Sequence, residues 1–172
     1  MKAGEFAQPA GEPAALSKST RATKFLEQTT VAFTVHTYVY DPDADKIGMQ
    51  AAEALGEPAS RVLKTLMALV DGKPVCVVVP SDHEVSMKKL AAAFGGKSAE
   101  MMKPAAAERV SGYKVGGISP FGQTKPPRAA IHASVMDEPY VFVNGGQRGL
   151  QVRLKPQDAA AVLKAIVAAV TA

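Results

Sequence analysis

The stretch VLKTLMALVDGKPVCVVV, from Val62 to Val79, consists of two apolar runs that flank Asp71-Gly72. An Asp-Gly pair between such runs is a strong signal for a tight hairpin, because both residues tolerate a positive φ angle. The first run, residues 62–70, is almost wholly apolar. A strand of this kind has both of its faces covered by other parts of the protein. The stretch therefore predicts a β-hairpin whose first strand is buried on both sides.

Further strands are expected on either side of this hairpin. The run FTVHTYVY at residues 33–40 is β-branched and aromatic, a composition that favours a strand. The other predicted strands cover residues 114–119, 128–133, 140–144 and 150–154.

Helices are predicted where apolar residues recur at helical spacing next to capping residues. Ser86 can cap a helix over residues 87–94, and Gly95 can end it in the left-handed conformation. Ser19 or Thr20 can cap a first helix in the same way. The remaining helical segments are expected at residues 48–55, 98–102, 104–110 and 156–170, the last two of which open with proline.

The order of these elements predicts the fold class. Strands and helices are interspersed without a regular βαβ period, which favours an α+β domain. We expect a curved, mixed and mostly antiparallel sheet, or a partial barrel, surrounded by helices. Residues 1–18 are rich in Ala, Pro, Gly and Glu, and they predict a disordered N-terminal tail. Residues 19–172 then form one folded domain.

The composition limits the class of protein and the cellular compartment that we expect. Of 172 residues, 47% are hydrophobic and 21% are charged, as is ordinary for a globular protein. No apolar run reaches membrane-spanning length, and no secretory signal is recognisable, so we expect a cytoplasmic protein. The single cysteine, Cys76, excludes an internal disulfide. The net charge of +4 suits an anionic partner such as RNA, although many proteins of this charge bind no nucleic acid.

Lys64 is a charged residue within the first apolar run of the hairpin. Burying an ammonium group without a partner is costly, so its position requires an explanation. Either Lys64 lies near a strand end and extends its head to water, or it points into a pocket for an anion or a carbonyl. The residues alone leave both interpretations open.

Two glycine-rich segments are further candidates for a site. Gly116 and Gly117 open the sequence GGISP, and paired glycines mark either a bulge or a place where a ligand meets the backbone. Exposed N–H groups there could hold a carbonyl or phosphate oxygen. The sequence NGGQRG at residues 144–149 predicts a hairpin loop, in which Arg148 is either solvated or contacts a phosphate.

Several familiar chemistries have no signature in the sequence. There is no Gly-x-Ser-x-Gly motif. The three histidines, His36, His83 and His132, lack the spacing of metal ligands, so we predict no metal and no cofactor. Cys76 is expected to behave as a small buried hydrophobic residue. Phe33 is expected in the core, or alternatively on a pocket wall.

Three sequence segments, in their order along the chain, together resemble a known family. They are RVLKTL at residues 61–66, GYKVGGISPFG at residues 112–122 and GGQRGL at residues 145–150. This arrangement is similar to the YbaK/EbsC proteins, relatives of the editing domain inserted in bacterial prolyl-tRNA synthetases. The resemblance runs from about Thr20 to the C-terminus, and its GGISP form is similar to the cysteine-type branch.

The resemblance implies a pocket for the aminoacyl group on the 3′ end of tRNA. Lys64 matches the essential lysine of the family, whose implied role is to bind and orient the ester or a nearby phosphate. Gly116 and Gly117 match the backbone wall that contacts the substrate. The other implied substrate-binding residues are Thr65, Phe33, Ser119, Asn144, Gly145 and Arg148.

The implied function is that of a trans-editing deacylase that removes cysteine from tRNA(Pro), or alternatively from tRNA(Cys). In this branch the thiol of the substrate attacks its own ester carbonyl, so the protein needs no nucleophile. The implied partners are the aminoacyl-tRNA 3′ end and, as an option, prolyl-tRNA synthetase, with no membrane and no metal.

One position departs from the family pattern. Gln151 follows the Arg-Gly-Leu of the third motif, where many relatives have an acidic residue. A neutral amide cannot act as a base or pair with a cation. Two alternatives therefore stay open: a deacylase for another misacylated tRNA such as Ala-tRNA(Pro), and a non-catalytic RNA-binding or regulatory module.

Overall fold

The strands form two sheets that meet near the start of the central hairpin. A computed structural model of the protein describes residues 19–43 and 49–172, so the predicted tail lies outside the described residues. The smaller sheet is antiparallel and has the order β1 (Thr34–Thr37), β7 (Leu150–Leu154), β6 (Val141–Gln147). A parallel bridge between Val62 and Phe142 connects its β6 strand to the beginning of the hairpin.

The larger sheet is built around the predicted hairpin. Its order is β4 (Ala99–Met101), β2 (Leu63–Val70), β3 (Lys73–Pro80), β5 (Arg128–His132), β8 (Ile166–Ala168). The β4–β2–β3 pairs are antiparallel, and the β3–β5 and β5–β8 pairs are parallel. The α+β prediction with mostly antiparallel pairing is thus confirmed, with the strands divided between two sheets.

The hairpin turn has the geometry that its sequence predicts. Asp71 and Gly72 both have positive φ angles, 49° and 79°, as a tight two-residue turn requires. The Asp71 carboxylate also accepts hydrogen bonds from the main-chain N–H groups of Lys97 and Ser98, at 3.0 Å each. This contact holds the segment before β4 against the end of the hairpin.

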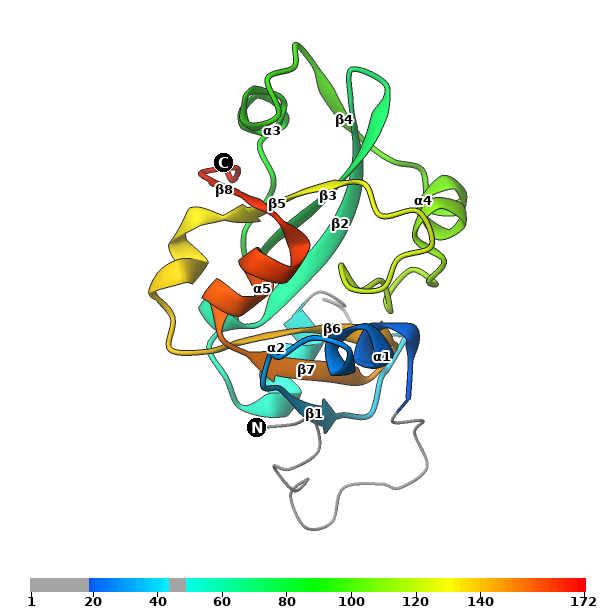
Figure 1. Ribbon diagram of the computed structural model, residues 1–172, viewed down its shortest axis with the longest axis vertical. Helices are drawn as coiled ribbons and strands as arrows, with labels where there is room; N and C mark the ends of the chain where they lie inside the picture. Colours follow the sequence, from blue (N-terminus) through cyan, green and yellow to red (C-terminus); the bar gives the residue numbers. More distant parts are fainter. Residues whose placement is uncertain (1–18, 44–48) are drawn as a thin grey trace.

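Helices pack around both sheets (Figure 1). The α-helices are α1 (Arg21–Glu27), α2 (Gln50–Leu55), α3 (Met87–Ala93), α4 (Pro104–Ser111) and α5 (Pro156–Leu163), with 3₁₀ turns η2 (Ala59–Arg61) and η3 (Ala133–Asp137). The capping predictions are confirmed: Thr20 caps α1 in a capping box, Ser86 caps α3, and Gly95 has a φ angle of 71°. No helix in the described part of the chain combines the length and apolarity needed to cross a bilayer.

Three secondary-structure predictions are wrong. Residues 98–102 form the edge strand β4 and not a helical turn, because the Asp71 turn draws Lys97 and Ser98 alongside β2. Residues 114–119 form a turn and not a strand, since Gly116 adopts a φ angle of 90°. The helix expected at 156–170 ends at Leu163, and the chain continues as β8 beside β5.

The two faces of β2 are buried against different parts of the protein. Leu63 and Met67 belong to the core cluster that contains Ile118 and Ala107 of α4. The alternate residues face the other way, and Ala68 packs in the cluster that contains Leu90 of α3. The prediction of a strand covered on both faces is therefore confirmed. It also follows that Thr65 and Lys64 belong to opposite faces.

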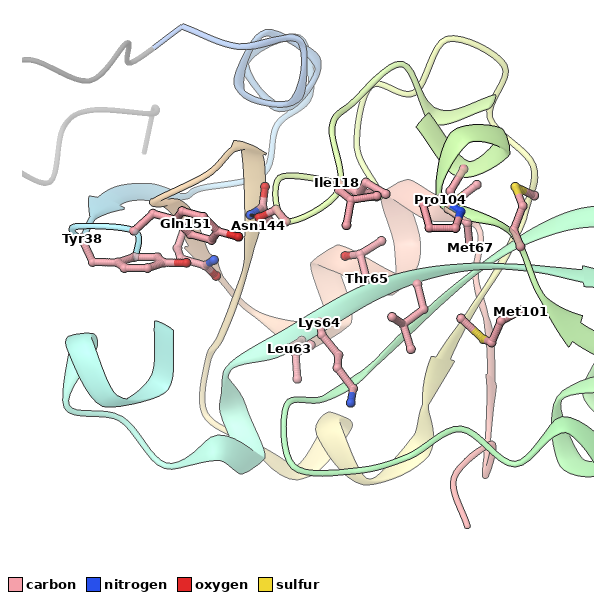
Figure 2. Close-up of a pocket in the computed structure, with 16 residues that line it drawn as sticks. Tyr38, Leu63, Lys64, Thr65, Met67, Met101, Pro104, Ile118, Asn144 and Gln151 are labelled. Carbon is pink, nitrogen blue, oxygen red and sulfur yellow. Dashed lines mark hydrogen bonds between the residues drawn. The ribbon is translucent and has the colours of Figure 1, made fainter. Parts of the chain in front are cut away.

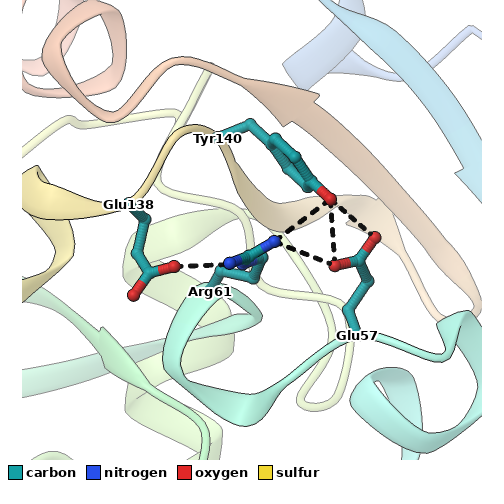
Figure 3. Close-up of polar contacts among 4 residues, drawn as sticks. All are labelled: Glu57, Arg61, Glu138 and Tyr140. Carbon is teal, nitrogen blue, oxygen red and sulfur yellow. Dashed lines mark hydrogen bonds and ion pairs between the residues drawn. The ribbon is translucent and has the colours of Figure 1, made fainter.

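A polar network fixes the approach to β2. The Arg61 Nε atom donates to Glu138 at 3.0 Å, and its Nη1 atom donates to the Tyr140 hydroxyl at 3.2 Å (Figure 3). The same hydroxyl donates to the Glu57 carboxylate at 3.1 Å. Because Arg61 precedes β2 and Tyr140 precedes β6, the network ties the two sheets together where their strands begin.

Candidate active site

A hollow of about 300 Å³ lies where the two sheets meet. Its walls come from β2, from the smaller sheet and from the turn that contains Gly116 (Figure 2). The residues that line it include Tyr38, Tyr40, Lys64, Thr65, Met101, Val115, Gly116, Asn144 and Gln151.

The main chain of Thr65 lies on an unpaired edge of β2. The Val62 carbonyl accepts from Ser81 beyond β3, and the Met67 carbonyl accepts from Met102 on the opposite side. Because main-chain direction alternates along a strand, Thr65 shares the direction of Met67, away from β3. No described strand pairs with β2 at Thr65 on that side, since β4 begins its pairing at Ala68. The N–H and C=O groups of Thr65 therefore remain available to a ligand.

Two polar side-chain atoms of the hollow lack hydrogen-bond partners. Thr65 Oγ1 and Gln151 Oε1 are both buried and have no hydrogen-bond partner among the described residues. Leaving such a group unsatisfied costs about 1–3 kcal/mol. Tyr38 lies beside Gln151: burial raises the pKa of its phenol, the Tyr40 phenol raises it further, and hydrogen bonds to Gly149 and Gln151 oppose the shift. The walls of the hollow are mostly apolar, but they contain polar groups whose hydrogen-bonding capacity is partly unused.

Lys64 lines the hollow, but its ammonium group does not face Thr65. Figure 2 shows the two side chains leaving β2 on opposite sides. The Lys64 Nζ atom lies 3.7 Å from Glu84 Oε1, and the Glu84 side chain is 87% exposed. The Lys64 head therefore lies on the α3 side of the strand beside an exposed carboxylate, and the Lys64 side chain itself is 21% exposed.

The two glycine-rich segments pack against each other. Asn144 Nδ2 donates to the Gly116 carbonyl at 3.2 Å, and Asn144 Oδ1 accepts from the Gly146 N–H at 2.7 Å. A Cβ atom on Gly117 would lie 2.9 Å from the Arg148 main-chain nitrogen. Close approach of two backbones is thus one reason for glycine here, and Asn144 holds the Gly116 turn against β6.

Other predicted site residues lie away from the hollow. Ser119 is fully buried, and its hydroxyl accepts from the Phe121 N–H at 3.1 Å. Phe33 is a core residue that is 1% exposed. Gly145 is buried, and a Cβ atom there would meet the Leu150 side chain at 2.1 Å. Arg148 and Gly117 line an adjoining depression with Lys114. The structure thus brings Lys64, Thr65, Gly116 and Asn144 together, but it does not bring Phe33, Ser119 or Gly145 to the same walls.

Sequence reasoning missed Tyr38 and Tyr40 as lining residues. The available signal was their position at the end of the aromatic run at residues 33–40, beyond the core residue Phe33. The sequence marked Gln151 only as a departure from the family pattern, although this residue is only 3% exposed.

The lining offers no activated protein nucleophile. Cys76 lies elsewhere, and burial raises the pKa of its thiol to about 12, so it holds its proton at neutral pH. Among residues 19–43 and 49–172, no three His, Cys, Asp or Glu side chains gather as a metal site would require.

Comparison with known proteins identifies the family. The family model described as the aminoacyl-tRNA editing domain matches residues 41–162. The chain belongs to the aminoacyl-tRNA editing domain family. EbsC of Enterococcus faecalis, provisionally named a Cys-tRNA(Pro)/Cys-tRNA(Cys) deacylase, is 31% identical over 141 residues, which are 81% of this chain and 85% of EbsC. The resemblance to the YbaK/EbsC family is thereby confirmed.

A synthetase sequence and a solved structure are also similar to this chain. Proline–tRNA ligase of Geobacter metallireducens is 41% identical over 68 residues, which are 40% of this chain and 12% of the ligase. A crystal structure provisionally described as a trans-editing enzyme for prolyl-tRNA synthetase superposes with a TM-score of 0.71 at 22% identity, over 81% of this chain and 87% of that one. The family and its relatives identify the protein as an aminoacyl-tRNA deacylase, an editing enzyme.

Proposed function

We propose that this editing domain removes cysteine misattached to tRNA(Pro), acting in trans. The observation that carries the proposal is the hollow at the unpaired edge of β2, where Thr65 and Gln151 offer unused hydrogen-bonding groups. The similarity to EbsC supports cysteine, and the similarity to proline–tRNA ligases supports tRNA(Pro) and a link to that synthetase. We propose that the protein acts in the cytoplasm, where aminoacyl-tRNA is used.

The chemistry needs positioning more than it needs a protein nucleophile. The thiolate of the bound cysteine attacks its own ester carbonyl; a carbon–sulfur bond forms, and the carbon–oxygen bond to the ribose breaks. The thiol proton ends on the ribose oxygen, and the amino acid leaves as a cyclic thiolactone. A thiol with an ordinary pKa near 8.5 is about a few per cent thiolate at neutral pH and strongly nucleophilic.

In this proposal the protein stabilises the developing oxyanion. The Thr65 N–H and hydroxyl donate to the carbonyl oxygen as negative charge develops there. The Gln151 amide and the Tyr38 phenol contact the α-amino group and the thiol of the substrate. The Gly116 and Gly117 turn, supported by Asn144, forms the wall that keeps the ester in the attack geometry.

Lys64 has a different role in this proposal. Because its side chain leaves the α3 face of β2, we assign it to the phosphate next to the terminal ribose and not to the reacting carbonyl. Arg148, beside Lys114 in the adjoining depression, binds the preceding phosphate.

Release of labelled amino acid from Cys-tRNA(Pro) and from Ala-tRNA(Pro) tests the proposal. We expect the wild type to deacylate Cys-tRNA(Pro) faster, and Thr65→Val to lower kcat by about tenfold or more through loss of one donor. Lys64→Ala should act mainly on KM, and Lys97→Ala, an exposed lysine outside the hollow, serves as its control. Faster loss of alanine than of cysteine would overturn the substrate assignment.

A further inference from the structure

Some of the apolar side chains that line the hollow remain exposed to solvent. Met101 and Val115 both line it, yet they remain 43% and 41% exposed. Tyr40 lines it too and is half-buried. Large apolar side chains that stay exposed on the walls of a hollow indicate a surface that a ligand covers.

Tyr40 is held in place by the loop that follows β6. The Arg148 guanidinium carbon lies 5.4 Å from the centre of the Tyr40 ring. Arg148 is fixed in turn, because its Nε atom donates to the Val115 carbonyl at 3.0 Å. A Cβ atom on Gly116 would lie 3.0 Å from the Tyr40 hydroxyl oxygen, so a glycine at this position leaves room for the ring. Tyr40 is thus a pre-positioned aromatic ring at the mouth.

The chemistry of the substrate indicates which group would contact this aromatic ring. In the proposed function, on which this inference rests, the aminoacyl group enters the hollow while the ribose that carries it stays at the mouth. The base of the same nucleotide then lies within one sugar of the ester. An unpaired base stacks well on an aromatic side chain, and an adjacent guanidinium strengthens the contact.

We propose that Tyr40, backed by Arg148, is the platform on which the terminal base of the tRNA stacks, so that it positions the ester in the hollow. Tyr38, the other phenol of the hollow, is half-buried as well, but it is less suited to this role because it is hydrogen-bonded to Gln151. The positive groups of Arg148 and Lys114 in the adjoining depression lie on the side from which the phosphate chain would approach.

Substrates with and without a base separate this role from a structural one. Kinetics would be measured for the wild type, Tyr40→Ala, Tyr40→Phe and the control Val39→Ala, which alters the neighbouring side chain, itself 83% exposed. On Cys-tRNA(Pro), we expect Tyr40→Ala to raise KM by about tenfold or more, and Tyr40→Phe to stay within about twofold of the wild type. On cysteine ethyl ester, which has no base, all four proteins should react equally.

Two results would overturn the platform while leaving the proposed function intact: an unchanged KM for Tyr40→Ala on Cys-tRNA(Pro), or an equal loss on the ethyl ester. If the wild type released no amino acid from either charged tRNA, the proposed function would fall. The platform would then be tested by fluorescence anisotropy with an uncharged RNA hairpin that ends in CCA. Weaker binding by Tyr40→Ala than by Tyr40→Phe would support it, and equal binding would refute it.

Discussion

Gln151 and Gln123 form a natural pair at the scale of single residues. Both amides are buried, and the Oε1 atom of each lacks a hydrogen-bond partner among the described residues. They differ in position: Gln151 lines the hollow, whereas Gln123 lines a separate depression and donates to the Ser119 carbonyl at 3.0 Å. Substitutions at the two positions can therefore separate an effect on activity from an effect on the fold.

Replacing each glutamine by leucine should give opposite results. In Gln151→Leu, the loss of a hydrogen bond is offset by removal of an unsatisfied acceptor, so the free energy of unfolding should change by less than about 1 kcal/mol. Deacylation should fall by about tenfold or more. Gln123→Leu also removes an unsatisfied acceptor, but it loses the contacts of Gln123 Nε2 with the Ser119 carbonyl, Met67 Sδ and Cys76 Sγ, so it should lower the free energy of unfolding by about 1 kcal/mol and keep the activity. Urea unfolding and Cys-tRNA(Pro) kinetics measure both, and a Gln151→Leu enzyme with normal rates would remove Gln151 from the site.

Gly117 tests the contact between the two glycine-rich segments. A Cβ atom on Gly117 would meet backbone atoms, the Arg148 nitrogen at 2.9 Å and the Gln147 carbonyl carbon at 3.1 Å, which cannot rotate away. We expect Gly117→Ala to lower the free energy of unfolding by about 1–3 kcal/mol, as overpacking does. Gly72→Asn is the matched control, because that turn has open space around it and asparagine tolerates its positive φ angle. Equal stability of the two variants would contradict the packing argument.

At the scale of elements, the sequence predicted the turns and helix ends, because these depend on residues that are close together in the chain. The Asp71-Gly72 turn, the Ser86 cap and the prolines that open α4 and α5 act within a few residues, and they were predicted correctly. The edge strands β4 and β8 were not, because their pairing depends on β2 and β5, which are distant in sequence. The residues of the hollow also divide into those that local sequence predicts and those that depend on distant contacts. Its motifs were recognisable, but the face from which Lys64 leaves β2 depended on packing of α3 and α4.

The C-terminal strand segment has a pH-dependent anchor. The Val170 N–H donates to His132 Nδ1 at 3.1 Å, which requires that nitrogen to be unprotonated. Burial lowers the pKa of His132, and the charges of His83 and Lys89 lower it further. Because the unfolded chain binds this proton more readily, the stability from His132 is present above its ordinary pKa of 6.5 and is lost as the pH falls below it.

We therefore expect the free energy of unfolding to fall between pH 7.5 and about pH 5 in the wild type, with a smaller fall in His132→Asn. Asparagine can still accept from Val170 but does not titrate. Urea titrations at both pH values measure the difference between the two proteins. An identical pH dependence would show that His132 is not the responsible group.

At the scale of the whole molecule, the hollow exists only because two sheets are held at a fixed junction. Thr65 comes from one sheet, and Asn144 and Gln151 come from the other. The Val62–Phe142 bridge and the Arg61 network lie at that junction (Figure 3). Loosening the junction should therefore affect stability and catalysis together, unlike the substitutions at Gln151 and Gln123.

Arg61→Met tests this coupling between the sheets. The change leaves Glu57 and Glu138, each 20% exposed in its side chain, without their shared cation. We expect the free energy of unfolding to fall by about 1–3 kcal/mol and kcat/KM to fall with it. The exposed residue Arg109 on α4 provides the control, since Arg109→Met should change stability by less than about 0.5 kcal/mol. Adding Glu138→Gln to Arg61→Met should cost less than the two single effects combined, because the partner charge is already unpaired. Additive effects in that double-mutant cycle would mean that the network does not join the sheets.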